Sequence, residues 1–192
     1  MPTHVALLRG INVGGGGKVP MVALRELVSS LGHGEVSTYI QTGNIIFTPA
    51  GAAGAATVDP VAVASELQAA IAAEFNVRSP VIVLSRVELA AVVAANPYPG
   101  EPEPRYVHGV FLPADPDAAA HERVAGALAV SAAAGGRDEA AFVGRTLYLH
   151  TPDGFGNSVL AKELLLKARK DPLAAGTARN WNTITKLLAL CG

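Results

Sequence analysis

The sequence has only one cysteine and few aromatic or charged residues. Of its 192 residues, 5% are aromatic and 16% are charged, whereas 50% are hydrophobic. The single thiol, Cys191, has no partner for an internal disulfide and no neighbouring cysteines for a thiolate metal site. We therefore expect neither a disulfide nor a metal, and the composition is typical of a cytoplasmic protein.

The chain also lacks a long apolar run. No segment approaches the roughly 18 consecutive apolar residues that a membrane-spanning helix needs. The first apolar run is short and has no basic region before it, so we expect no secretory signal and no membrane partner. A chain of this size can bury a core as one domain or as two small ones.

Charge is unevenly spread, although the formal net charge is only −1. Residues 86–139 carry a net charge of −4, and residues 140–192 carry +4. A basic C-terminal third suits an anionic partner by long-range attraction, and a solvated helix face is the ordinary alternative.

The first half of the sequence predicts the order strand, helix, two hairpin strands, helix and strand. Thr42-Gly43-Asn44 suits a hairpin turn, because glycine and asparagine accept positive φ. The predicted elements are a strand at 3–13, a helix beginning at Pro20, strands at 35–41 and 45–48, a helix capped by Asp59, a strand at 80–84, and a short helix opened by Ser85 and Glu88. This is the split βαβ order of a ferredoxin-like unit.

A proline-rich segment at 96–104, "NPYPGEPEP", separates this half from the rest, and we expect a linker there. Beyond it the same order recurs, with a strand at 106–112, a helix from Asp115 to about 127, hairpin strands at 139–143 and 146–150, a helix at 158–168, a short strand near Thr177 and a last helix at 180–190. We therefore predict an α+β fold of two ferredoxin-like (βαββαβ) halves with an additional C-terminal helix. The predicted domains are residues 1–95 and 105–192.

The run "RGINVGGGGKVPM" places four glycines and a lysine between a strand and a helix. It is not a P-loop, because Asn12 stands at the first glycine position and Val19 replaces the hydroxyl residue that binds magnesium. It also lacks the G-x-G-x-x-G spacing of dinucleotide-binding loops. Glycine N–H groups before a helix, with Arg9 or Lys18 beside them, can still bind an anion. The alternative is a flexible loop without a ligand.

Arginine and tryptophan stand out elsewhere in the chain. Arg9 interrupts an apolar strand, so we expect it to lie at the strand end or to pair with a buried partner. Arg179 and Trp181 are residue types common at binding surfaces, although tryptophan is also a common core anchor. Asn180 is a candidate N-cap for the last helix.

Three segments, "ALLRGINVGG", "STYIQTGNIIF" and "TARNWNTITKLL", together resemble the signature segments of the bacterial family called domain of unknown function 1697. The resemblance runs from the first strand to the last helix, and it implies the two-halved α+β fold and no established activity. Thr42 stands where the family commonly has serine and retains the hydroxyl. The other marked positions are mostly polar, which suits a surface cleft: Arg9, Gly10, Asn12, Gly14, Gly15, Tyr39, Gly43, Asn44, Thr177, Arg179, Asn180 and Thr183.

Three classes of function stay open. The first is binding of a phosphate-bearing ligand, either a nucleotide or nucleic acid, with contacts at Arg9, Asn12, Gly14, Gly15, Lys18, Tyr39, Thr42, Asn44, Thr177, Arg179, Asn180 and Thr183. Nucleic acid would also suit the basic residues Lys162, Lys167, Arg169, Lys170 and Lys186. The second is an enzyme of unknown reaction with a polar cleft around Arg9, Tyr39, Asn44 and Arg179. The third is a structural or regulatory protein that associates with itself. We expect no cofactor, because no histidine pair has metal-ligand spacing and no cofactor motif is present.

Overall fold

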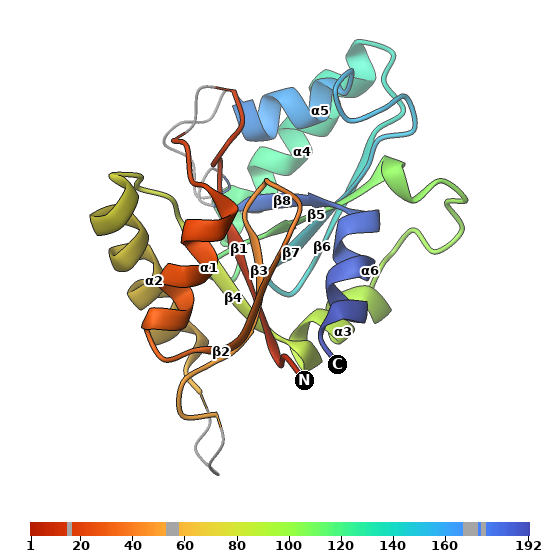
Figure 1. Cartoon of the computed structure of the whole chain (residues 1–192). Helices are drawn as coiled ribbons and strands as arrows, with labels where there is room; N and C mark the ends of the chain where they lie inside the picture. The colour runs from red at the N-terminus through yellow and green to blue at the C-terminus, as the bar shows by residue number, and fades with distance from the viewer. Residues whose placement is uncertain (15–16, 53–57, 167–172, 174–175) are drawn as a thin grey trace. The chain divides into compact units, whose positions relative to one another are not determined.

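The computed structural model describes residues 1–14, 17–52, 58–166, 173 and 176–192. These residues form two four-stranded antiparallel sheets and six α-helices (Figure 1). The chain divides into two compact units, Met1–Ala91 with Lys186–Gly192, and Val92–Thr185. The division into domains at 1–95 and 105–192, joined by a linker, remains a prediction from the sequence.

The first unit contains a sheet with the strand order β2-β3-β1-β4. Its elements are β1 (His4–Leu8), α1 (Met21–Ser30), β2 (Gly34–Tyr39), β3 (Asn44–Thr48), α2 (Pro60–Phe75), β4 (Val81–Ser85) and the first part of α3 (Arg86–Ala94). Strand β1 pairs antiparallel with both β3 and β4, so β1 and β2 run in one direction with β3 between them. The predicted order of elements is confirmed.

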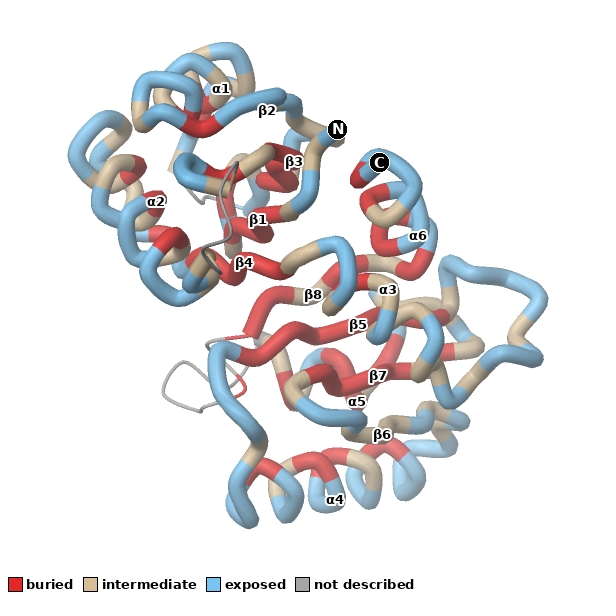
Figure 2. The backbone as a smooth tube through the Cα atoms, turned by 90° about the horizontal axis from the view of Figure 1, so that it is seen from below, coloured by how far each residue is buried: buried red, intermediate tan, exposed pale blue. Residues whose placement is uncertain are grey.

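Helices α1 and α2 cover one face of this sheet (Figure 1). Alternation along β1 turns Ala6 and Leu8 toward them, and both residues are fully buried. Leu24 of α1 and the pair Leu67 and Ile71 of α2 supply the facing side chains. In Figure 2, the tubes of α1 and α2 show short buried segments between exposed and intermediate ones. Burial of each large aliphatic side chain stabilises the unit by roughly 1.5–3 kcal/mol.

The predicted capping residues begin the helices of the first unit. The Asp59 carboxylate accepts a hydrogen bond from Val61 N at 2.9 Å at the start of α2. Ser85 and Glu88 form the predicted capping box, because Ser85 N donates to the glutamate at 2.8 Å and Glu88 N donates to Ser85 Oγ at 3.2 Å.

Two local predictions in the first unit were wrong. The first strand ends at Leu8 instead of residue 13, because Gly10 and Asn12 take φ values of 66° and 55°. In the hairpin, Gly43 takes the predicted positive φ of 80°, but Asn44 belongs to β3 and Ile40 takes the second positive φ, 51°. A β-branched residue rarely adopts this conformation, so the hairpin turn is locally strained.

The second unit repeats the same order of elements, with a sheet ordered β6-β7-β5-β8. Its elements are the end of α3, the single turn η1 (Pro104–Tyr106), β5 (Val107–Phe111), α4 (Ala118–Ala133), β6 (Glu139–Val143), β7 (Thr146–His150), α5 (Val159–Ala161), the π-helical turn η2 (Lys162–Leu166), β8 (Thr177–Asn180) and the start of α6 (Trp181–Leu190). The predicted helix at 158–168 is therefore α-helical only at its beginning, where Ser158 caps it. Residues 167 and 168 lie outside the described part of the chain.

The core of the second unit lies between its sheet and α4. Val110 and Leu112 occupy the places that Ala6 and Leu8 hold in the first unit, and they pack with residues of α4 and α5. The pairing registers correspond as well, because His4 pairs with the last residue of β4 and His108 pairs with the last residue of β8. The loop between β1 and α1 therefore has its counterpart in the loop between β5 and α4.

Helix α4 begins later than predicted. Asp117 is its N-cap, and the carboxylate accepts a hydrogen bond from Ala120 N at 2.8 Å. Asp115 was the wrong choice because Asp and Pro recur in "ADPD", and only Asp117 directly precedes the helix. None of the helices within the described ranges is long and apolar enough to span a bilayer.

Cys191 is buried in the first unit. Its Sγ lies 3.7 Å from the carbonyl oxygen of His4, and Arg86 Nε donates to the Cys191 carbonyl at 2.7 Å. Burial raises the pKa of the thiol to about 11, against the smaller opposing effect of the arginine. The thiol is therefore protonated at neutral pH.

Candidate functional site

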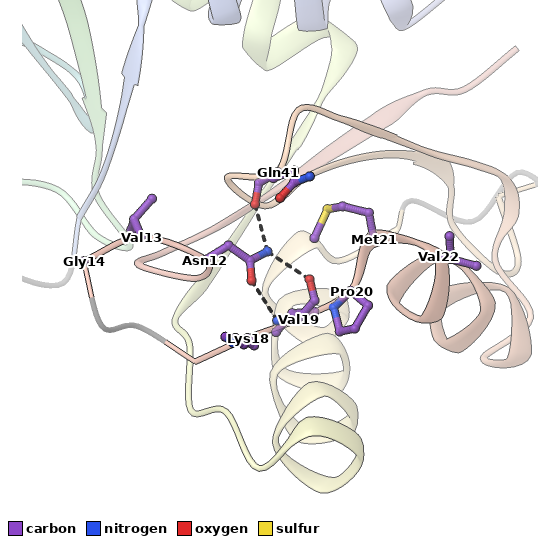
Figure 3. Close-up of a pocket in the computed structure, with 9 residues that line it drawn as sticks. All are labelled: Asn12, Val13, Gly14, Lys18, Val19, Pro20, Met21, Val22 and Gln41. Carbon is purple, nitrogen blue, oxygen red and sulfur yellow. Dashed lines mark hydrogen bonds between the residues drawn. The ribbon is translucent and has the colours of Figure 1, made fainter.

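Asn12 organises the glycine-rich loop (Figure 3). Its side-chain Nδ2 donates to the carbonyl oxygens of Val19 at 2.9 Å and Gln41 at 3.0 Å, and its Oδ1 accepts from Val19 N at 2.9 Å. Asn12 N also donates to the Gly17 carbonyl at 3.1 Å. Asparagine tolerates the positive φ here. The predicted site residue Asn12 thus joins both ends of the loop to the hairpin, and its amide is committed to these bonds.

The clamped loop borders a hollow of about 690 Å³, which we call the glycine-loop hollow. This volume lies in the range of ligand pockets, roughly 300–1,000 Å³. Its walls come from the loop, the start of α1 and the tip of the β2–β3 hairpin (Figure 3). The lining residues are Asn12, Val13, Gly14, Lys18, Val19, Pro20, Met21, Val22 and Gln41.

The described lining of the hollow is mostly apolar, with two carboxamides and one cation. Lys18 is exposed and supplies the positive charge. Residues 10–25 and 36–48, which include every described lining residue, contain no aspartate or glutamate. Val13 and Val22 expose 49% and 58% of their surface, so both add apolar surface to the lining.

The start of α1 is open toward this hollow. Its N-cap is Pro20, which makes no side-chain capping bond, and the first turn contains no acidic residue. The first N–H groups of a helix have no partner inside the helix, and they form the positive end of its dipole. Met21 and Val22, the first two residues of α1, line the hollow. At the corresponding position of the second unit, the carboxylate of Asp117 caps α4.

Arg9 follows the end of β1 and does not line the hollow. Its backbone is fixed by Ser79, whose Oγ accepts from Arg9 N at 3.0 Å and donates to Arg9 O at 2.8 Å. The side chain is half-buried, and burial lowers the pKa of the guanidinium. Arg9 therefore lies at the strand end, as expected.

The predicted hairpin residues Tyr39, Thr42 and Asn44 shape the turn. Asn44 is fully buried, and its Nδ2 donates to the Tyr39 carbonyl at 3.0 Å and to Thr42 Oγ1 at 3.3 Å. Only Gln41 of this turn lines the hollow. Sequence reasoning missed Gln41, although its place beside the predicted turn was a usable signal.

The predicted site residues Thr177, Arg179, Asn180 and Thr183 belong to the second unit. Arg179 is buried, and its Nη1 donates to Thr177 Oγ1 at 2.8 Å and to the Ala178 carbonyl at 2.9 Å. Burial lowers the pKa of this guanidinium to about 10. Ligand contact by these residues stays a prediction.

Asn180 and Trp181 have clear structural roles. The Asn180 side chain accepts from Asn182 N at 2.9 Å and so caps α6. Trp181 is buried with its ring 6.1 Å from that of Tyr148, and it anchors α6 on the sheet of the second unit.

Several predicted contacts fall outside the described residues, namely Gly15, Lys167, Arg169 and Lys170. Within the described ranges, no group of three histidine, cysteine, aspartate or glutamate side chains is placed to hold a metal ion.

Comparison with known proteins identifies a family and a fold. The model of a family described as "Protein of unknown function (DUF1697)" matches residues 1–148. No curated protein matches the chain significantly. The chain is similar to the solved structure of a conserved bacterial protein from Streptococcus pneumoniae, with a TM-score of 0.69 and 21% identity over 100% of this chain and 99% of the other. At this identity the likeness shows the fold alone.

Proposed function

Because the chain belongs to the DUF1697 family, a family of unknown function, we propose its function from its own residues: it binds a phosphate-bearing ligand, a nucleotide or nucleic acid, in the glycine-loop hollow. Lys18 and the backbone of Gly14 contact the phosphate, and Asn12 holds the loop in place. Arg9, which precedes the loop in the sequence, adds a second positive charge outside the lining.

One observation carries this proposal. The two units begin their first helices differently, because Asp117 supplies a carboxylate to the start of α4, whereas in the described part of the chain α1 has neither a side-chain cap nor an acidic residue in its first turn. A negative group at a helix N-terminus is stabilising by about 0.3–1 kcal/mol, and more when partly buried. A bound phosphate would provide at α1 what Asp117 provides at α4. The hollow and Lys18 give this anion space and a counter-charge.

We also propose that each unit is a ferredoxin-like fold. The order strand, helix, hairpin, helix, strand supports this, as does the arrangement of each sheet, which places the fourth strand beside the first and the third between the first and second. The glycine-loop hollow then lies where the first strand leads into the first helix.

The test is a thermal-shift and calorimetric titration with inorganic phosphate and with AMP. Binding to the folded chain raises its apparent stability. Lys18→Ala is expected to weaken binding about tenfold and to change stability by less than about 0.5 kcal/mol, because the side chain is exposed. Lys186→Ala, another exposed lysine that does not line the hollow, is the matched control.

Pro20→Asp gives the sharper result. It places a carboxylate at the N-cap of α1, as in α4, so the variant should fold normally and bind phosphate at least about tenfold more weakly. Unchanged phosphate affinity in both Lys18→Ala and Pro20→Asp would remove the hollow from the site. A salt-sensitive mobility shift with an oligonucleotide separates nucleic acid from a free nucleotide.

A further inference from the structure

We propose that the ligand of the glycine-loop hollow is a nucleoside monophosphate, a single phosphate joined to a flat body with apolar faces, and that it binds without a divalent cation. This inference rests on the function proposed above and narrows its ligand class.

The charge of the lining selects one phosphate group. A phosphomonoester carries roughly −1.5 to −2 charges at neutral pH. Lys18 is the only charged residue among the described lining residues, and residues 10–25 and 36–48 contain no acidic residue at all. A triphosphate would bring more negative charge into a lining that offers a single cation.

The same lining contains no anionic or hydroxyl ligand for magnesium. Enzymes that bind triphosphates hold Mg²⁺ with at least one aspartate carboxylate, together with a serine or threonine hydroxyl or an asparagine amide. The described lining has three polar side chains, Asn12, Lys18 and Gln41, and none of them carries a carboxylate or a hydroxyl. The Asn12 amide oxygen already accepts from Val19 N. We therefore expect the phosphate of the ligand to contact Lys18 and the backbone directly, without a bridging magnesium ion.

The apolar wall accounts for the rest of the ligand. Val13 and Val22 are half-exposed apolar residues at opposite ends of the lining, and Met21 extends from the start of α1 toward Gln41 at the hairpin tip (Figure 3). A flat base laid against Met21 and Val22, which are neighbours at the start of α1, would remove apolar surface from water. The exposed Gln41 carboxamide can donate to and accept from a base edge. The volume of about 690 Å³ is large enough for a nucleotide.

The experiment compares five compounds by isothermal titration at constant ionic strength. AMP, ribose 5-phosphate, adenosine and ATP are each titrated with EDTA, and AMP and ATP also with excess Mg²⁺. Inorganic phosphate is the fifth. AMP should bind with the same Kd in EDTA and in Mg²⁺, and at least about tenfold more tightly than ribose 5-phosphate, adenosine or ATP.

A pair of variants tests the apolar wall. Val22→Ser removes an apolar side chain from the lining at the second position of α1, and AMP should then bind about threefold to tenfold more weakly while ribose 5-phosphate binds as before. Val61→Ser is the matched control, because Val61 occupies the second position of α2, exposes 63% of its surface and does not line the hollow.

The outcomes separate this inference from the proposed function. If ribose 5-phosphate binds as tightly as AMP, or if ATP with Mg²⁺ binds most tightly and EDTA abolishes it, the inference fails and phosphate binding stands. An unchanged AMP affinity in Val22→Ser also overturns the inference. If no phosphate compound binds, both fail.

Discussion

The loop between β1 and α1 and the loop between β5 and α4 occupy the same position in the two units, but the first carries a lysine and the second carries aspartates. The first unit uses a glycine-rich loop with a lysine, clamped by Asn12, and leaves α1 without a side-chain cap. The second unit uses a short loop rich in aspartate, and Asp117 caps α4. Their sheets share the strand order, and the first strand pairs with the fourth in the same register in both units. The comparison teaches that the same fold position can begin its helix either with a carboxylate cap or without any side-chain cap.

The largest expected contrast lies in the hairpin turns. A methyl group at Gly43 would lie 2.7 Å from Leu8 Cβ and 3.0 Å from Ile11, at a φ of 80°. Gly43→Ala should therefore lower the free energy of unfolding by about 4 kcal/mol, through overpacking and left-handed strain. Gly144→Ala, in the corresponding turn of the second unit, meets no atom within 4 Å and should cost about 1 kcal/mol. Urea unfolding of both variants measures the contrast. Equal losses would mean that the two turns are equally tolerant.

The corresponding histidines should differ under acid. Burial lowers the pKa of His108 to about 4, and its ring stacks on Phe155 with centroids 4.0 Å apart. Burial also lowers the pKa of His4, but Glu88 opposes the shift. Below about pH 6.5 the unfolded chain therefore binds a proton at His108, whereas the folded chain does not. The contribution of neutral His108 to the free energy of unfolding is complete above that pH and is lost as the pH falls.

By pH 4 the loss from His108 should reach about 3 kcal/mol. The measurement is the unfolding free energy of the wild type and of His108→Phe from pH 7 to pH 4, with histidine NMR titrations as a second readout. The variant should lose less stability on acidification. Parallel pH profiles of the two proteins would contradict the assignment.

The clamp in the first loop should also have a measurable effect. Asn12→Ala removes three side-chain hydrogen bonds, so it should lower the free energy of unfolding by about 2 kcal/mol and weaken phosphate binding. Asn12→Asp keeps the acceptor for Val19 N but places a carboxylate oxygen against the carbonyl oxygens of Val19 and Gln41, so it should be no more stable than Asn12→Ala. A fully stable Asn12→Ala would show that the loop holds its shape without the clamp.

The smallest expected effect is at the helix starts. Asp117→Ala should cost about 1 kcal/mol, because Ala120 N loses its acceptor. Pro20→Ala should change stability by less than about 0.5 kcal/mol, because Pro20 makes no side-chain cap. Thermal unfolding compares the two variants. A larger loss for Pro20→Ala would break the contrast between the two helix starts.

Much of the fold could be predicted from the sequence because its local signals are strong. Asp59 and the Ser85–Glu88 capping box mark helix starts, and Gly43 marks the hairpin turn. The choice between Asp115 and Asp117 could not be made, since either aspartate can cap a helix and only packing decides where α4 begins.

The candidate site was less predictable than the fold. The glycines and Lys18 pointed to the loop, but the role of Asn12 depends on its bonds to Val19 and Gln41, which are 7 and 29 residues away. Nothing local in the sequence indicates that an asparagine will take a φ of 55° and turn its amide inward. The apolar wall was missed because single exposed valines are common on surfaces.

The buried, protonated thiol of Cys191 makes the native chain a convenient background for chemical labelling. Maleimides react with thiolates. The Cys191 thiol is buried, and its raised pKa keeps it protonated at neutral pH. A cysteine introduced at exposed Val13 would therefore be the preferred target. A dye attached there would follow the glycine loop during a titration, without prior removal of the natural cysteine.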